Sequence, residues 1–223
     1  QYIYSVKQDT LYTHLYIGGE AETEMNGETI RICQESDYPW DGTVKIKVDG
    51  FNKKSFKLAL RVPGWCRHWT VCINGLEAGK ESRLVNGYLI LDRCWSAADE
   101  VTLVMDMPVE LIQANPKVRA NAGRVAIQRG PLVYCFEEAD NGKNLSALSI
   151  AAEPDLQYSF EKDFLGGAVT IQASGFRRKE ENWDGALYKP YIKQEQPVLL
   201  KAVPYFLWGN RGQGEMQVWT HHV

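Results

Sequence analysis

The feature of this sequence that most constrains its fold is a period-two alternation of apolar and polar residues along most of its length. Thr43–Val48 and Phe56–Val62 show it clearly, with apolar side chains alternating with Lys and other residues. Because successive side chains of a β-strand point to opposite faces, this pattern predicts strands with one buried face. Further segments of this kind occur at residues 11–17, 88–91, 100–105, 109–112, 123–129, 131–134, 157–160, 168–173, 198–203 and 215–219.

Turn signals separate these segments at close intervals. Asn-Gly or Asp-Gly pairs supply the positive φ angles of tight hairpins, and they stand at residues 26–27, 49–50, 74–75 and 86–87. The most helix-like piece is the short connector Trp95–Asp99, and no repeat of propeller or solenoid type is visible. The sequence therefore predicts an all-β fold of antiparallel strands.

The 223 residues are enough for one large domain or two modest ones. Strand signals lapse near Ala114–Lys117, where a proline follows. We therefore predict two jelly-roll-like β-sandwich domains, residues 1–115 and 116–223; an alternative is that one sandwich is inserted into the other. The polar stretch Arg177–Gln196 has no periodicity and is predicted to be a long loop.

Charge and hydropathy exclude two classes of partner. The chain has 25 Lys and Arg against 28 Asp and Glu, so it lacks the basic excess typical of nucleic-acid-binding surfaces. No apolar run approaches the ~20 residues that cross a bilayer. The sequence starts at Gln1 on an alternating segment without a signal-peptide pattern, which suggests a longer or processed protein and leaves its cellular location open.

Cysteines and histidines do not form a recognisable metal or nucleophile motif. The five cysteines include no C-x-x-C pair, and three of them lie inside apolar runs, which predicts small buried side chains: Cys33, Cys72 and Cys135. The four histidines show no ligand spacing with Cys or Glu. Cys66 and His68 are too close in sequence for a good dyad. We predict no metal, cofactor or catalytic residue in this chain.

Paired carboxylates are harder to exclude, since the two acids of a glycosidase lie far apart in sequence. Glu137, Glu138 and Asp140 follow an apolar strand where it meets a loop. Adjacent carboxylates at a strand end are more often solvated than catalytic. The glycine-rich residues 209–214 precede a strand, so they lack the helix N-terminus that holds a phosphate.

Aromatic residues are the positive signal, with seven Trp and eleven Tyr. Trp40, Trp65 and Trp183 stand in turn-like contexts, where an aromatic ring can stack on a sugar or anchor an interface. The alternative for each is a role in capping the core. Three other tryptophans lie next to strand-like runs and are predicted to be core: Trp95, Trp208 and Trp219.

Several segments together resemble the C-terminal region of glycoside hydrolase family 127, the β-L-arabinofuranosidase-like enzymes. The most specific is residues 123–134, GRVAIQRGPLVY. The others follow in the expected order: YTHLYI at 12–17, DYPWDG at 37–42, LRVPGW at 60–65, ADN at 139–141, LKAVPY at 200–205 and WGNRG at 208–212.

The resemblance implies that an (α/α)6-barrel catalytic domain precedes the β-sandwiches. In the family, a zinc-bound cysteine of a Cys-Cys pair is the nucleophile and a glutamate the acid/base, and these positions would precede Gln1. This chain has no such pair, so zinc is expected only in that missing domain.

Three functions follow from these observations. The first is a non-catalytic accessory region whose partner is its own upstream catalytic domain, with Trp40 and Trp65 suited to the contact. The second is a stand-alone carbohydrate-binding module for a plant-type carbohydrate. The third is a free-standing enzyme using the carboxylates at Glu137, Glu138 and Asp140.

Overall fold

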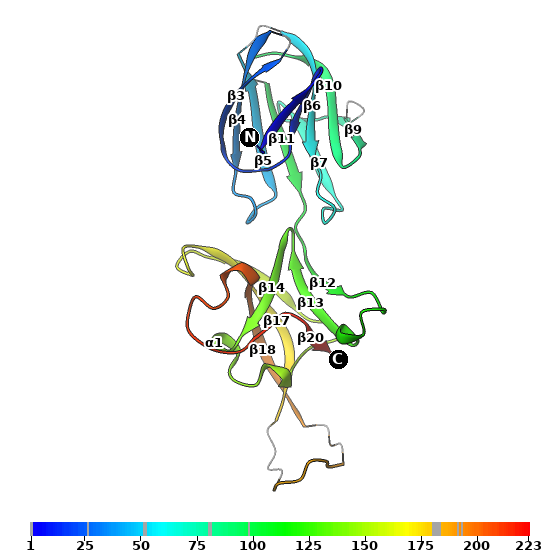
Figure 1. Ribbon diagram of the computed structural model, residues 1–223, viewed down its shortest axis with the longest axis vertical. Coiled ribbons are helices and arrows are strands. Elements are labelled where there is room, and N and C mark those ends of the chain that lie inside the picture. Colours follow the sequence, from blue (N-terminus) through cyan, green and yellow to red (C-terminus); the bar gives the residue numbers. More distant parts are fainter. Residues whose placement is uncertain are drawn as a thin grey trace. The chain divides into compact units, whose positions relative to one another are not determined.

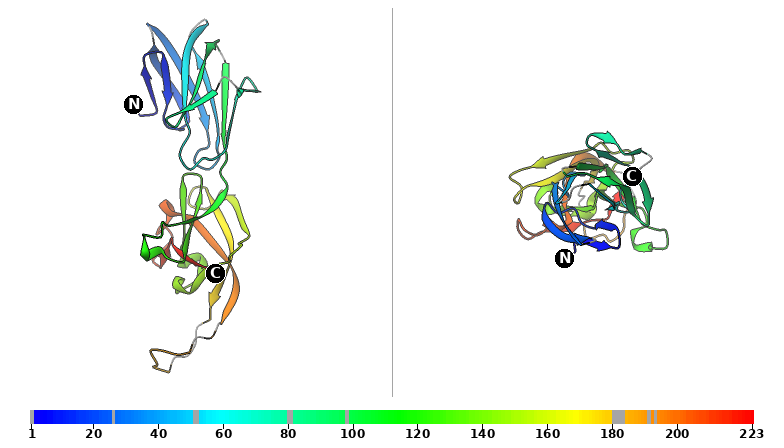
Figure 2. Two further views of the ribbon diagram at one scale, coloured as in Figure 1. Left: turned by 90° about the vertical axis from the view of Figure 1, so that its right-hand side faces the viewer. Right: turned by 90° about the horizontal axis from the view of Figure 1, so that it is seen from above.

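The computed structural model describes residues 2–25, 27–50, 53–79, 82–97, 99–179, 184–190, 192 and 194–223. The chain forms two compact units, Gln1–Met107 and Pro108–Val223, each a continuous stretch of sequence (Figure 1 and Figure 2). The predicted boundary at residues 115 and 116 falls inside the second unit, because β12 (Val109–Gln113) pairs with β13 (Arg124–Arg129) of that unit.

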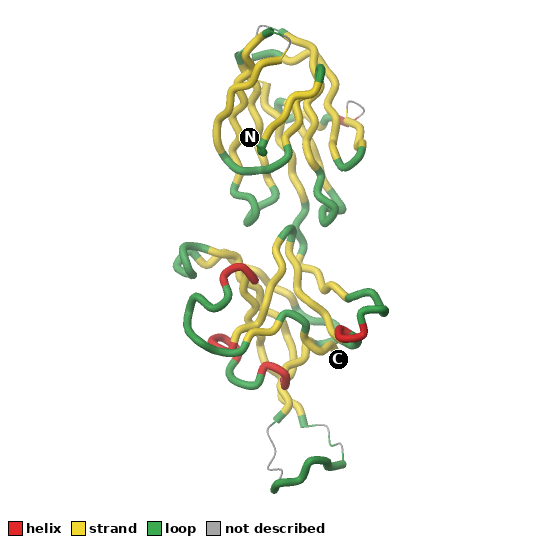
Figure 3. Tube along the Cα trace, in the orientation of Figure 1, coloured by secondary structure: helices red, strands yellow, loops and turns green. Residues whose placement is uncertain are grey.

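Strands dominate both units, which confirms the predicted all-β fold class (Figure 3). In the described ranges the helical elements are short, and their bounds are α1 (Glu138–Asn141), η2 (Arg119–Asn121), η3 (Leu145–Ala147) and η4 (Tyr205–Leu207). Among the described residues, no helix is long and apolar enough to cross a membrane.

The first unit contains two sheets. The five-stranded sheet has the order β1 (Tyr4–Lys7), β2 (Thr10–Thr13), β6 (Lys54–Arg61), β10 (Tyr88–Trp95) and β9 (Ser82–Val85). The six-stranded sheet has the order β3 (Gly19–Met25), β4 (Glu28–Ser36), β5 (Thr43–Asp49), β11 (Asp99–Met105), β7 (Trp69–Ile73) and β8 (Leu76–Glu77). Neighbouring strands are antiparallel except β2 and β6, which are parallel.

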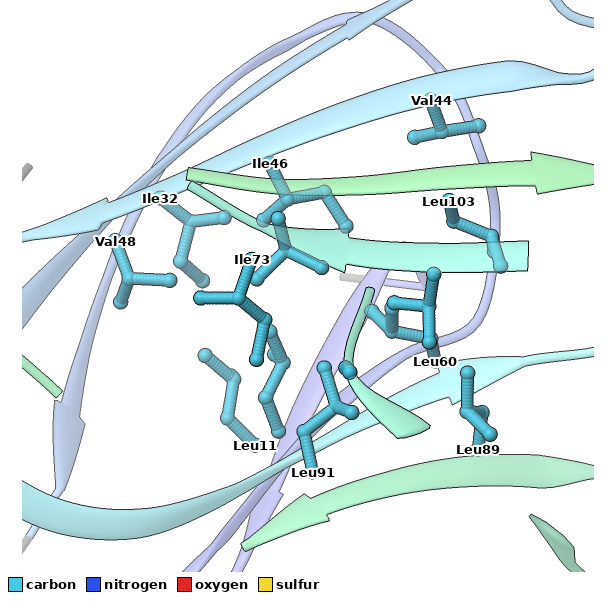
Figure 4. Packing of buried hydrophobic residues seen from close by; sticks show 14 of the residues in the cluster. Leu11, Ile32, Val44, Ile46, Val48, Leu60, Ile73, Leu89, Leu91 and Leu103 are labelled. Carbon is cyan, nitrogen blue, oxygen red and sulfur yellow. The ribbon is translucent and has the colours of Figure 1, made fainter. Parts of the chain in front are cut away.

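Both sheets contribute to one core, as the alternating sequence requires. Ile46 of β5 and Leu60 of β6 are fully buried and belong to opposite sheets (Figure 4). Trp95 is also fully buried, and its Nε1–H donates to the Phe56 carbonyl at 2.9 Å. Trp95 ends β10 and Asp99 begins β11, so the predicted short connector lies between these two strands.

Two Asn-Gly pairs form the predicted tight hairpins. Asn74 and Gly75 join β7 to β8 with φ angles of 51° and 79°. Asn86 and Gly87 join β9 to β10 with φ angles of 50° and 79°. Positive φ at both central positions matches the twist of the flanking strands, which explains the residue types.

The second unit is built from one nine-stranded sheet that contains a closed circuit. Hydrogen-bonded neighbours run β13, β20, β15, β17, β18, β14 and back to β13. The strands not yet given are β14 (Leu132–Glu137), β15 (Leu148–Ile150), β16 (Leu156–Glu161), β17 (Ala168–Arg178), β18 (Glu195–Pro204), β19 (Met216–Gln217) and β20 (Thr220–His222). The core inside this circuit includes Tyr134, Phe136, Ile150 and Ile171.

Two expectations for this unit differ from the structure. The long strands β17 and β18 extend into the predicted loop at 177–196, and Arg178 pairs with Glu195. The predicted strand at 215–219 contains only the two residues of β19, and the chain forms β20 directly after it.

Candidate functional site

The predicted tryptophans of the first unit lie in neighbouring turns. Trp40 stands between β4 and β5, Trp65 stands between β6 and β7, and both are half-buried. Trp65 stacks on Tyr38 with ring centroids 6.4 Å apart and planes at 27°. Tyr16 meets Tyr38 edge-on at 6.0 Å. We call Tyr16, Tyr38 and Trp65 the aromatic group.

Burial in this group changes the acidity of its phenols. Tyr16 is 3% exposed and donates its hydroxyl to the Arg61 carbonyl. Desolvation raises the pKa of both Tyr16 and Tyr38 above the ordinary tyrosine value. The aromatic group therefore stays neutral at physiological pH and presents a partly exposed apolar stack at this end of the unit.

The remaining tryptophans are distributed differently from the prediction. Trp183 lies outside the described residues. Trp208 was predicted to be core but is 44% exposed, because β18 ends at Pro204 and the chain turns outward through η4. Trp219 is half-buried and Trp95 is core as predicted.

The carboxylates proposed for catalysis are held by an arginine that sequence reasoning missed. Arg211 Nη1 donates to Asp140 Oδ1 at 2.8 Å, and its Nη2 bonds both Asp140 Oδ2 and Glu137 Oε2. Glu137 is 6% exposed, and its Oε1 accepts the Gly209 N–H at 2.9 Å. The guanidinium also lies over the Phe164 ring, 4.8 Å from its centroid. We call Glu137, Asp140 and Arg211 the carboxylate clamp.

The clamp favours the charged form of its arginine. Hydrogen bonds from Arg211 to Asp140 and then to Glu137 raise the guanidinium pKa further above its ordinary value, against the opposing effect of burial. Both oxygens of Asp140 and both of Glu137 accept hydrogen bonds in this arrangement. These two carboxylates are therefore used to fasten residues 209–211 to β14 and α1.

Glu138 has a different environment from its two neighbours. Its Oε2 accepts the Glu215 N–H at 3.0 Å, while its own N–H donates to the Glu215 carbonyl at 3.0 Å. Glu215 Oε2 in turn accepts the Leu145 N–H at 2.6 Å. A cavity of about 300 Å³ opens here, lined by residues 137–139, 208, 209 and 212–215. Trp208 and Glu138 thus lie on the walls of one hollow.

Cysteine and histidine side chains make structural contacts. Cys66 Sγ bonds the backbone carbonyl of His68 at 3.2 Å, not its imidazole, and burial raises the pKa of the thiol. Cys135 is fully buried, and desolvation raises its pKa to about 12. Cys33 and Cys72, predicted to be buried, are half-buried.

The zinc implied by the resemblance has no ligand set in the part of the chain that the structure describes. No group of three or more His, Cys, Asp or Glu side chains lies close enough there to hold a metal ion.

Sequence reasoning also missed a hydrogen-bonded chain that joins β1 and β10 through His14, the residue directly after β2. His14 Nε2 lies 2.7 Å from Ser5 Oγ, and His14 Nδ1 lies 2.7 Å from Tyr88 Oη. Tyr12 stacks on the imidazole with ring centroids 6.0 Å apart. Two hydroxyls and one aromatic ring therefore fix the orientation of His14. In the sequence, the only sign of a role for His14 was its place in the YTHLYI segment.

Comparison with known proteins identifies the family. The sequence model of the β-L-arabinofuranosidase GH127 middle domain matches residues 10–107, and that of the glycoside hydrolase family 127 C-terminal domain matches residues 109–221. This chain belongs to glycoside hydrolase family 127. The two family 127 domains meet between residues 107 and 109, which is where the two compact units divide.

Relatives in family 127 match along the whole chain. The structure of a GH127 β-L-arabinofuranosidase from Geobacillus stearothermophilus T6 is similar at a TM-score of 0.94 and 45% identity, covering 100% of this chain and 35% of that one. A second GH127 β-arabinofuranosidase structure gives 0.88 at 32% identity, covering 99% and 36%. A non-reducing end β-L-arabinofuranosidase from Bifidobacterium longum subsp. longum is 35% identical over 98% of this chain and 34% of its own length.

The matched relatives are much longer than this sequence. The chain spans about a third of the length of each of them. It corresponds to the non-catalytic β-domains of the family, which confirms the prediction of an accessory region.

Proposed function

We propose that this chain is the accessory region of an enzyme that releases terminal β-L-arabinofuranosyl groups, and that it packs against the catalytic domain of that enzyme. The observation that carries the proposal is the family 127 match of both units, at 45% identity to the Geobacillus enzyme. The zinc that the family resemblance implies is proposed to be bound by the catalytic domain and not by this chain.

The surface proposed for this contact is formed by the aromatic side chains in the β4–β5 and β6–β7 turns of the first unit. The stacked Tyr38 and Trp65, with Trp40 in the same turn as Tyr38, present large rings that are only half-buried. Contacts between domains of one chain resemble protein–protein interfaces, where Trp and Tyr are enriched. We add Trp183 as a fourth contact candidate on its sequence context alone.

The experiment compares the 223-residue chain with the longer enzyme that includes its catalytic domain. Trp65→Ala is the test variant. Trp69→Ala is the matched control, because Trp69 is also partly buried against the same core but belongs to β7. Trp40→Ala and Trp183→Ala complete the series. Melting temperature and kcat/KM on 4-nitrophenyl β-L-arabinofuranoside are measured.

We expect Trp65→Ala and Trp69→Ala to lower the melting temperature of the isolated chain by similar amounts. In the longer enzyme, only Trp65→Ala should cost additional stability and reduce kcat/KM, since it alone would remove an interdomain contact. Equal effects of Trp65→Ala in the two proteins would refute the contact surface. Absence of arabinofuranosidase activity in the longer enzyme would refute the assigned reaction.

A stand-alone carbohydrate-binding module is the second candidate function. The observation that favours it is the exposed Trp208 on the wall of the cavity beside Glu138.

A further inference from the structure

The second unit exposes an unusual group of aromatic side chains around η4. Tyr205, Phe206 and Trp208 are 45%, 56% and 44% exposed, and the rings of Tyr205 and Trp208 lie 6.4 Å apart. Large apolar side chains gathered on a surface usually mark a binding site, whereas scattered ones do not. Trp208 differs from the other two because it also lines the cavity of about 300 Å³.

The walls of this cavity combine one aromatic residue with hydrogen-bonding groups. Glu138 and Glu215 each have Oε2 fixed by a backbone N–H. Within the part of the chain that the structure describes, Oε1 of each has no hydrogen-bond partner and can accept one. Gln213, Gly212 and Gly214 also belong to the lining. Side-chain acceptors are therefore held in place before any ligand arrives.

The charge of the lining selects the ligand class. Three glutamates and no Lys or Arg line the cavity. The nearby Arg211 forms ion pairs with Glu137 and Asp140. Phosphates, sulfates and uronates would be repelled. A neutral polyol has hydroxyls that donate to carboxylate oxygens and C–H faces that pack on an indole ring. The volume lies at the lower end of the range for small-molecule sites, which suits a single sugar ring.

Gly214 permits this arrangement. A Cβ on residue 214 would lie 3.0 Å from Glu138 Cβ and 3.4 Å from its Oε2. A larger residue there would press on Cβ of Glu138, the residue whose carboxylate we expect to accept a sugar hydroxyl. The close approach of the loop to Glu138 thus depends on glycine.

From these observations, we propose that the hollow between Trp208 and Glu138 binds a single neutral sugar ring, with the ring stacked on Trp208 and its hydroxyls bonded to Glu138 and Glu215. The site lies entirely within the second unit and requires no catalytic domain. Its function would be to hold a glycan. The ligand class follows from the lining of the cavity and does not depend on the reaction proposed above.

The test is a titration of the 223-residue chain, followed by two-dimensional NMR of backbone and indole N–H signals. Methyl β-L-arabinofuranoside is the neutral probe, and D-glucuronate and tetramethylammonium are the charged probes. Trp208→Phe identifies the Trp208 indole signal, Trp208→Ala tests the stacking, and Glu138→Gln tests the acceptor. Trp69→Ala in β7 of the first unit is the control.

We expect the arabinofuranoside to shift the Trp208 indole signal and those of residues 212–215. Trp208→Ala should weaken binding about tenfold or more, while Trp69→Ala leaves it unchanged. The NMR map of the unmodified chain keeps the test valid if Trp208→Ala does not fold. The proposal is overturned if no signal of this loop shifts at ~20 mM arabinofuranoside, if glucuronate binds more tightly, or if only tetramethylammonium binds. None of these outcomes bears on arabinofuranosidase activity of the longer enzyme, so the two proposals fail separately.

Discussion

Replacing Arg211 by Met tests how strongly the carboxylate clamp stabilises the second unit. The guanidinium side chain is 22% exposed, and its partners Glu137 and Asp140 are only 8% and 12% exposed. Removing one partner of a buried ion pair leaves an uncompensated charge, which costs about 3–5 kcal/mol. Here two carboxylates would be left, so we expect a loss at the upper end of that range. A domain of this size is stabilised by only about 5–15 kcal/mol, so the loss should be large.

Native-state hydrogen exchange is the suitable assay because it separates the two units. In Arg211→Met, the free energy of opening measured at amides in β14 and β18 should fall by about 4 kcal/mol or more. The free energy of opening at amides in β5 and β11 should stay unchanged. Arg31→Met is the matched control. Arg31 pairs with Glu22 at 3.0 Å, but both side chains are more than half exposed, so the expected effect is about 0–1 kcal/mol.

A compensating variant separates charge burial from lost packing. Combining Arg211→Met with Glu137→Gln and Asp140→Asn removes the uncompensated charges, so it should recover part of the lost protection. If Arg211→Met lost no more stability than Arg31→Met, the clamp would contribute nothing measurable. If the triple variant were less stable than Arg211→Met, buried charge would not explain the loss.

Two further predictions concern the first unit. Asp99 is 7% exposed; burial opposes its ionisation, but hydrogen bonds from the Ser96 N–H and the Asn74 amide outweigh this effect and lower its pKa. The ionised Asp99 carboxylate therefore contributes its full stabilisation above the pKa of an aspartate in the unfolded chain, about 3.9. This stabilisation is lost as the pH falls through the lower pKa of Asp99 in the folded protein. Asp99→Asn should cost roughly 1–3 kcal/mol in urea unfolding at pH 7 and converge with the parent protein at acidic pH. Asp92→Asn, at an exposed position, should change the stability at pH 7 by less than about 0.5 kcal/mol. A pH-independent difference for Asp99→Asn would contradict the assignment. In Gly42→Ala, the added Cβ would lie 1.9 Å from the Met105 carbonyl oxygen, so thermal unfolding should show a loss of roughly 3 kcal/mol. Gly64→Ala, with open space around the added Cβ, should change stability by less than about 1 kcal/mol, and equal effects of the two variants would exclude the steric explanation.

Most of the fold could be predicted because a strand with one buried face requires apolar and polar residues to alternate, and this alternation is visible in the sequence. Strand β3 was not predicted, since Glu20, Glu22 and Glu24 leave it little apolar character. It lies at the edge of its sheet, where charged residues discourage pairing with other chains. Strand β20 was missed for another reason: its pairing with β13 and β15 depends on residues distant in sequence.

The second-unit site was only partly predictable. Glu137, Glu138 and Asp140 were noticed because they follow a strand, but the partner that decides the role of two of them, Arg211, lies 74 residues from Glu137. Trp208 was misassigned because proximity to a strand-like run does not say where that strand ends. Such contacts arise from tertiary structure, which local pattern cannot specify.

The clamp and the proposed sugar site share one segment of chain. Glu137 accepts hydrogen bonds from both Arg211 and the Gly209 N–H, and Gly209 directly follows Trp208. The ion pair that stabilises the loop therefore also fixes the residue that would stack on a sugar. It follows that Arg211→Met would disturb stability and the cavity together and cannot report on binding alone. Trp208 and Glu138 are not members of the ion pair, so Trp208→Ala and Glu138→Gln test ligand binding while leaving the carboxylate clamp in place.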